Sequence, residues 1–149
     1  MLSMKPTALI FCLLVLFVFG CSENENKTEE KLRDFVIEWN ANHTELKAAY
    51  LIRYYMDVVV YYGKERTKTL VQQDKNLLFQ QFPEYTQRIL NDELEITEEA
   101  GTYLVTFTKR VNYNGIEADY TTYLSLSYKN HKFKILREGV AENSKDLDA

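Results

Sequence analysis

The sequence contains few cysteines and histidines, and it lacks the short motifs that mark most metal and nucleotide sites. Its 149 residues include two cysteines, Cys12 and Cys21, and two histidines, His43 and His131. Their spacing forms no set of zinc ligands, and no glycine-rich phosphate loop occurs. Both histidines fall in predicted turns, where solvated side chains are the rule. The sequence therefore supports neither a metal site nor a cofactor.

The chain also has no excess of positive charge. It holds 18 lysines and arginines against 22 aspartates and glutamates, for a formal net charge of −4. Binding to nucleic acid depends on basic residues that neutralise phosphates. We therefore predict that the protein does not bind nucleic acid.

A long apolar run occurs at the N-terminus, at residues 8–19, and it is too short to cross a membrane. It has 12 residues, whereas the apolar core of a bilayer needs about 20. With Lys5 before it, the run is typical of a cleavable signal peptide. The residues that follow, Val18-Phe19-Gly20-Cys21, resemble a bacterial lipobox. This resemblance implies cleavage after Gly20 and lipidation of Cys21, for example with palmitate; the alternative is an ordinary secretory signal.

Four segments follow from this assignment. Residues 1–20 are the predicted signal peptide, 21–30 the lipidated cysteine and a polar tether, 31–140 one domain, and 141–149 a polar tail. The mature chain has no second cysteine, so its core alone must stabilise the exported domain. We expect it in the bacterial cell envelope, anchored by lipid, with the outer membrane as the favoured location. Glu23 and Glu25 resemble the surface-export signal of some Bacteroidota lipoproteins, so the periplasmic and surface faces both stay open.

Three helices are expected before residue 83. The first begins near a cap at Thr28 and has an apolar stripe, made up of Leu32, Phe35, Val36 and Trp39. Asn42 and Glu45 have the spacing of a capping box for the second helix. Its expected apolar stripe is Leu46, Ala49, Tyr50 and Tyr54.

The third helix is predicted to begin at Thr69, which has capping-box spacing with Gln72. Pro83 prevents its continuation. Its expected apolar side consists of Val71, Leu78 and Phe82.

Strands dominate the rest of the chain. One early strand is expected at residues 57–62, and a later meander has a period of two, with strands at 94–96, 102–113, 116–128 and 133–137. Asn114-Gly115 predicts a two-residue hairpin turn. One face of this antiparallel sheet is apolar, and the helices must cover it. The expected fold class is therefore α+β.

Several short signatures and the order of elements resemble the nuclear transport factor 2-like superfamily. The signatures are Tyr61-Tyr62-Gly63, Phe82-Pro83 and Phe133-Lys134-Ile135. The resemblance covers about residues 31–138 and implies a cone-shaped fold, with about three N-terminal helices packed on a curved antiparallel sheet. The superfamily includes ketosteroid isomerase and scytalone dehydratase as well as binding proteins, so the fold does not select an activity.

Asp57 is the one candidate for a catalytic acid. It begins a predicted strand among Tyr54, Tyr55 and Tyr61. In isomerase-like members of the superfamily, an acid in an apolar pocket works with tyrosine hydroxyls. The alternative, which we favour, is that Asp57 faces solvent or caps a helix and that the tyrosines belong to the core.

Lys109 and Arg137 each interrupt an apolar alternation. Lys109 stands between Phe107 and Val111, and Arg137 follows Phe133 and Ile135. If both side chains point toward the helices, two cations lie at the mouth of an aromatic cone and need an anionic partner. The alternative is that both extend into solvent or pair with acidic residues. The other expected lining residues are Tyr113, Tyr120 and Tyr54.

We therefore predict an envelope-anchored lipoprotein whose domain is non-enzymatic. It would bind a small ligand, for which an anion is one candidate, or a protein partner. One alternative is an isomerase-like or dehydratase-like enzyme; another is an interaction or structural module without a pocket. The tyrosine-rich run at residues 50–62 also permits a homodimer.

Overall fold

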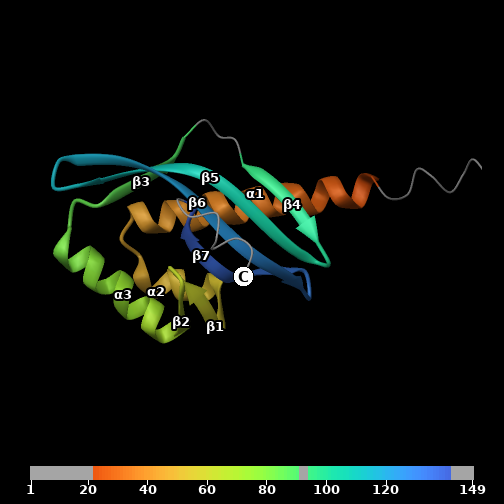
Figure 1. Ribbon diagram of the computed structural model, residues 1–149, viewed down its shortest axis with the longest axis horizontal. Coiled ribbons are helices and arrows are strands. Elements are labelled where there is room, and N and C mark those ends of the chain that lie inside the picture. The colour runs from red at the N-terminus through yellow and green to blue at the C-terminus, as the bar shows by residue number, and fades with distance from the viewer. Residues whose placement is uncertain (1–21, 91–93, 142–149) are drawn as a thin grey trace, which may run out of the picture. The chain divides into compact units, whose positions relative to one another are not determined.

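The computed structural model describes residues 22–90 and 94–141 (Figure 1). The chain divides into two units, residues 1–34 and 35–149. The predicted signal peptide, Cys21 and most of the polar tail lie outside the described residues. Among the described helices, none is both long enough and apolar enough to span a membrane.

The first helix, α1 (Ser22–Thr44), is longer than predicted at both ends. It begins at Ser22, so the expected cap at Thr28 is wrong. In the first unit, Glu29 and Arg33 form an exposed ion pair of 2.8 Å one helical turn apart. The role of residues 21–30 as a tether stays a prediction.

In the second unit, α1 continues through Asn42, which is therefore not the cap of another helix. Its side chain donates hydrogen bonds to the Glu38 carbonyl at 2.9 Å and to the Tyr54 hydroxyl at 2.8 Å. The next helix, α2 (Ala48–Leu51), has four residues and passes directly into the 3-10 turn η1 (Ile52–Tyr54). Because this segment is so short, the predicted stripe fails: Ala48 and Leu51 are buried, whereas Tyr50 is half exposed.

The third helix, α3 (Lys68–Gln81), contacts α2 and the neighbouring strands β1 and β2. Its N-cap is Thr67, whose hydroxyl accepts a hydrogen bond from the Leu70 amide, so the predicted cap at Thr69 is wrong. Its buried side chains are Val71, Lys75 and Phe79, which differ from the predicted set except at Val71.

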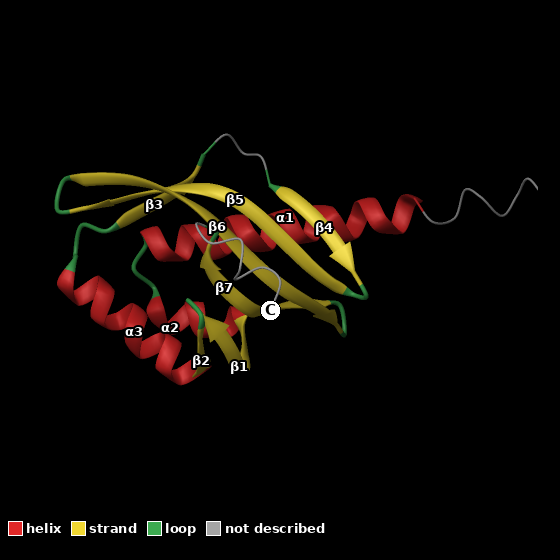
Figure 2. Cartoon of the chain, in the orientation of Figure 1, coloured by secondary structure: helices red, strands yellow, loops and turns green. Residues whose placement is uncertain are grey.

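Within the described residues, seven strands form one sheet in the order β2-β1-β7-β6-β5-β3, with β4 paired to β5. Figure 2 draws these strands in yellow and the helices in red. Their bounds are β1 (Tyr55–Tyr61), β2 (Lys64–Thr67), β3 (Thr86–Ile89), β4 (Glu95–Glu99), β5 (Thr102–Tyr113), β6 (Ile116–Lys129) and β7 (Lys132–Val140). The sheet is mixed: its β5-β6-β7 meander is antiparallel, as expected, and the early strand β1, whose place in the sheet was not predicted, pairs with β7 in parallel. The sequence prediction also missed β2 and β3. The turn at Asn114-Gly115 is confirmed, with positive φ at both residues.

A bulge in β7 decides which side chains face the helices. Ile135 pairs with Leu126 and Arg137 pairs with Ser125, so Leu136 is an extra residue on β7. This insertion reverses the alternation after Ile135. Arg137 consequently lies on the outer face, and Glu138 takes the inner face instead.

The helices cover the inner face of the sheet. Trp39 of α1 stacks edge-on against Phe107 of β5, with ring centroids 6.0 Å apart. His43 of α1 meets Phe79 of α3 at 6.3 Å. Between these contacts lie the polar side chains of the candidate site.

Candidate functional site

Two cavities of similar volume lie on opposite faces of the sheet. The inner-face cavity is open to solvent on one side and has a volume of about 380 Å³. Its walls are mainly aromatic and apolar and are formed by Tyr62, Leu78, Phe82, Tyr85, Lys109, Val111, Tyr113, Tyr120 and Val140. The outer-face cavity, about 350 Å³, contains Arg137 together with Tyr123, Ser125 and residues of β4 and β5. The structure thus brings together Lys109, Tyr113 and Tyr120, and it separates them from Arg137. The predicted pair of cations at one mouth is wrong, because of the bulge at Leu136.

Lys109 reaches the inner-face cavity from the middle of β5. It is only 5% exposed, and its Nζ donates one long hydrogen bond, of 3.4 Å, to the Tyr62 hydroxyl. Among the described residues, no carboxylate lies within ion-pair distance of this ammonium group. Burial lowers the pKa of Lys109 to about 8; Glu138 raises it and Lys75 lowers it further.

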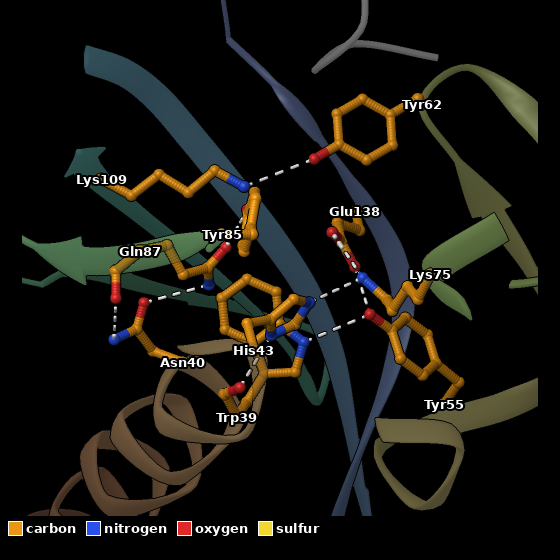
Figure 3. Close-up of polar contacts among 10 residues, drawn as sticks. All are labelled: Trp39, Asn40, His43, Tyr55, Tyr62, Lys75, Tyr85, Gln87, Lys109 and Glu138. Atoms are coloured by element: carbon orange, nitrogen blue, oxygen red, sulfur yellow. Dashed lines mark hydrogen bonds and ion pairs between the residues drawn. The ribbon is translucent and has the colours of Figure 1, made fainter. Parts of the chain in front are cut away.

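Lys75 is a second buried lysine, which the sequence prediction missed. It projects from α3 toward His43 and Glu138 (Figure 3). The residue is 2% exposed. Its Nζ lies 2.7 Å from His43 Nε2 and 3.4 Å from Glu138 Oε1. The ring of Tyr61 lies under the same ammonium, at 5.1 Å. Burial lowers the pKa of Lys75, although Glu138 opposes the shift.

The contacts of His43 fix its tautomer. Its Nδ1 lies 2.8 Å from the Trp39 carbonyl oxygen, which can only accept, so Nδ1 carries the proton. Nε2 therefore accepts a hydrogen bond from Lys75. Burial and the charge of Lys75 lower the pKa of His43 well below its usual value, which keeps the ring neutral. The prediction of a solvated His43 is wrong, whereas His131 is exposed in a turn.

Glu138 supplies the negative charge of this network. Its carboxylate is 1% exposed and accepts a short hydrogen bond from the Tyr55 hydroxyl. That hydroxyl accepts in turn from Trp39 Nε1, at 3.2 Å. We call Lys75, Lys109, His43 and Glu138 the buried cationic cluster, because two lysines, one carboxylate and a neutral imidazole sum to one positive charge when both lysines are protonated.

A second set of hydrogen bonds fixes the opposite wall of the cavity. The Tyr85 hydroxyl donates to Gln87 Oε1 at 2.7 Å, and Gln87 Nε2 donates to Asn40 Oδ1 at 3.0 Å. Thr44 adds a hydrogen bond of 2.6 Å from its hydroxyl to the Gln87 carbonyl. These contacts join β3 to the end of α1 and hold the Tyr85 ring against the cavity.

Asp57 and Tyr54 do not line the inner-face cavity. The Asp57 side chain is 84% exposed and pairs with Lys68 at 2.6 Å, which lowers the pKa of the carboxyl group. A general base in a dry pocket needs a buried, apolar environment that raises its pKa. The alternative, in which Asp57 faces solvent, therefore describes this residue. Tyr54 is buried, with its ring against Phe35 and its hydroxyl bonded to Asn42.

Within the described residues, no cluster of three or more histidine, cysteine, aspartate or glutamate side chains could hold a metal ion. The ionisable residues that line the inner-face cavity are one lysine, Lys109, and four tyrosines, Tyr62, Tyr85, Tyr113 and Tyr120. Such a set can pair with an anion, or present an amine and several phenols to an apolar ligand.

No family model matches this sequence, and no curated protein sequence matches it. Solved structures do match. Bd1075 of Bdellovibrio bacteriovorus is similar at a TM-score of 0.68 and 14% identity, over 80% of this chain and 42% of that protein, so this chain spans less than half of Bd1075. An NTF2-like protein of unknown function from Pseudomonas putida KT2440 is similar at a TM-score of 0.66 and 10% identity, over 77% of this chain and 86% of that one.

A protein of unknown function with a cystatin-like fold, from Nostoc punctiforme, is similar at a TM-score of 0.62 and 8% identity, over 75% of this chain and 88% of that one. At such identities the likeness concerns the fold alone. The chain has the nuclear transport factor 2-like fold, an α+β arrangement of three helices on a mixed seven-stranded sheet, and the predicted resemblance is confirmed.

Proposed function

We propose that this domain binds a small amphipathic anion in the inner-face cavity and does not catalyse a reaction on it. The observation that carries the proposal is Lys109. Its ammonium group is almost fully buried, lines an apolar cavity and, among the described residues, has no carboxylate within ion-pair distance. A buried charge without a counterion is costly, and an anionic ligand would remove that cost.

The size and walls of the cavity favour a ligand with an apolar body. Small-molecule sites typically enclose about 300–1,000 Å³, and this cavity of about 380 Å³ lies at the lower end of that range. At about 30 Å³ per water-sized group, it holds roughly a dozen non-hydrogen atoms. Phe82, Tyr113 and Val111 would contact the apolar part, and Lys109 would pair with the anionic head.

The surroundings of the acids argue against the enzymatic alternative. Glu138 and His43 are engaged with Tyr55 and Lys75, and neither lines the cavity. Asp57 lies at the surface. An isomerase-like reaction needs a base within hydrogen-bond reach of the substrate, and the described residues of the cavity wall supply no carboxylate or imidazole.

Isothermal titration calorimetry on the full-length protein tests the proposal, with decanoate, decanol and decyltrimethylammonium as probes. We expect decanoate to bind more tightly than decanol and the cation not to bind. Lys109→Met should weaken decanoate binding about tenfold or more, as expected for the loss of a buried charge pair. The matched control is Arg137→Met on the outer face, which should leave binding unchanged. Equal affinities for decanoate and decanol would contradict an anion site.

We further propose that a lipid on Cys21 anchors the domain at the cell envelope. The support is the sequence around Cys21, with its short apolar run and lipobox resemblance. Metabolic labelling with palmitate should mark the wild-type chain, and Cys21→Ser should lose both the label and the membrane association. The control is Cys12→Ser. Cys12 lies inside the predicted signal peptide, so this variant should keep both the label and the membrane association. Labelling that persists in Cys21→Ser would overturn the anchor.

A further inference from the structure

We infer that Lys109 also captures amphipathic aldehydes in the inner-face cavity as a reversible imine. This inference rests on the proposed ligand cavity, and it adds a covalent chemistry that anion binding does not require. The chemical class of ligand is an aldehyde whose apolar tail fits the aromatic walls.

The placement of the two buried lysines carries the inference. Lys109 lines the cavity and has one long hydrogen bond, of 3.4 Å, to the Tyr62 hydroxyl. Lys75, by contrast, is bonded to His43 at 2.7 Å and paired with Glu138, and it does not line the cavity. Only one of these two amines can therefore meet a ligand, and that amine is not engaged by a carboxylate of the described residues.

The electrostatics favour a nucleophilic amine at this position. Burial lowers the pKa of Lys109 to about 8; the Glu138 carboxylate opposes this shift, and the charge of Lys75 adds to it. At neutral pH about a tenth of such an amine is neutral, compared with well under a hundredth of an ordinary lysine. A lysine desolvated beside another cation is a known route to an amine nucleophile.

The chemistry balances without an added reagent. The lone pair of neutral Lys109 Nζ forms a bond to the carbonyl carbon, and the carbonyl π pair moves to oxygen. A proton lost from nitrogen and one gained at oxygen give a carbinolamine. Departure of water then breaks the carbon–oxygen bond and leaves the imine, with no change of oxidation state.

Tyr62 is placed to assist these proton transfers. Its hydroxyl lies 3.4 Å from Nζ. Although 43% of the Tyr62 surface is exposed, its hydroxyl end is desolvated, and this burial together with the Glu138 carboxylate raises the pKa of Tyr62 well above its usual value. The phenol therefore stays protonated and can donate to the oxygen that leaves as water. Tyr62 acts as a positioning and hydrogen-bond-donating group beside the amine.

Reductive trapping tests the inference. The full-length protein is mixed near neutral pH with a limiting amount of decanal, reduced with borohydride, digested and mapped by mass spectrometry. At pH 7 the neutral fraction of Lys109 exceeds that of an ordinary lysine by on the order of 300-fold. We therefore expect the decyl amine at Lys109 in at least about tenfold excess over any exposed lysine. Lys109→Arg keeps the charge and should lose the label, whereas Lys64→Arg, at an exposed lysine of β2, should keep it.

The positions labelled in the wild-type protein test the inference even if Lys109→Arg fails to fold. Excess decanoate should protect Lys109 and leave the exposed lysines labelled as before. A label spread over exposed lysines, with none at Lys109, would overturn the inference. Decanoate binding without a label at Lys109 would overturn the imine alone. A label at Lys109 without decanoate binding would support the imine and overturn the anionic ligand.

Discussion

At the scale of single residues, the site depends on lysines in places where the chain pattern calls for apolar side chains. Lys109 stands between two inward-facing apolar residues of β5, and this break in the alternation was visible in the sequence. Lys75 carries a comparable signal. It lies four residues from both Val71 and Phe79, in the middle of the buried stripe of α3. A lysine inside an apolar helical stripe can therefore indicate a buried charge.

Lys109 should destabilise the ligand-free domain below about pH 8. Its pKa in the folded state, about 8, is lower than the ordinary value of 10.5, so the unfolded chain binds more protons between these values. Stability should therefore rise with pH across this interval. Lys109→Met removes the charge at similar volume and should stabilise the domain at neutral pH by on the order of 1–3 kcal/mol.

Urea unfolding at about pH 7 and about pH 9.5 measures this effect. The difference between wild type and Lys109→Met isolates Lys109, because Lys75 and the buried tyrosines titrate in both proteins. Lys64→Met, at an exposed site, is the control, and its free energy of unfolding should depend on pH as in wild type. If the free energy of unfolding changed equally with pH in wild type and Lys109→Met, Lys109 would not be the source of the pH dependence.

At the scale of elements, the structure distinguishes two threonines that the sequence does not. Thr67 caps α3 through a hydrogen bond of 3.3 Å from the Leu70 amide, and Thr69 is an exposed residue within the helix. Thr67→Ala should reduce the free energy of unfolding by about 1 kcal/mol. Thr69→Ala should change it by only a few tenths of a kcal/mol, because alanine favours the helix interior. Thermal or urea unfolding of both variants measures the contrast, and equal losses would rule out Thr67 as the cap.

The bulge in β7 shows why the face of Arg137 could not be read from the sequence. The row Phe133, Ile135, Arg137 has a regular period of two, and nothing in those residues marks Leu136 as an extra residue. The register of β7 is set instead by its pairing with β6, which the local sequence of β7 does not reveal. A one-residue shift exchanges the two faces, and it brought Glu138 rather than Arg137 to the buried cationic cluster.

At the scale of the whole molecule, the sequence predicted the α+β class, the long hairpin at Asn114-Gly115 and the resemblance that the structural comparisons confirm. The class and the hairpin follow from local periodicity and turn chemistry, whereas the resemblance rests on the order of elements and on short sequence signatures. The sequence did not predict the pairing of β1 with β7 or the short strand β3, because long-range pairing decides both. The cationic cluster joins α1, α3, β5 and β7, so only the tertiary structure could assemble it.

Ligand binding, protonation and charge should be coupled across the domain. An anion beside Lys109 would raise its pKa from about 8 toward the ordinary range, so binding near pH 8 should take up a fraction of a proton. Well below pH 8 the lysine is already protonated, and the uptake should vanish. Affinity should be full below the pKa of the free protein and should fall as pH rises through it.

Calorimetry of decanoate binding in two buffers of different ionisation enthalpy measures this uptake near pH 8. The apparent enthalpy should depend on the buffer in wild type and should not depend on it in Lys109→Arg, whose guanidinium stays charged. The outer-face variant Arg137→Met is the matched control and should show the wild-type uptake. A buffer-independent enthalpy in wild type, with binding intact, would mean that the anion binds away from Lys109.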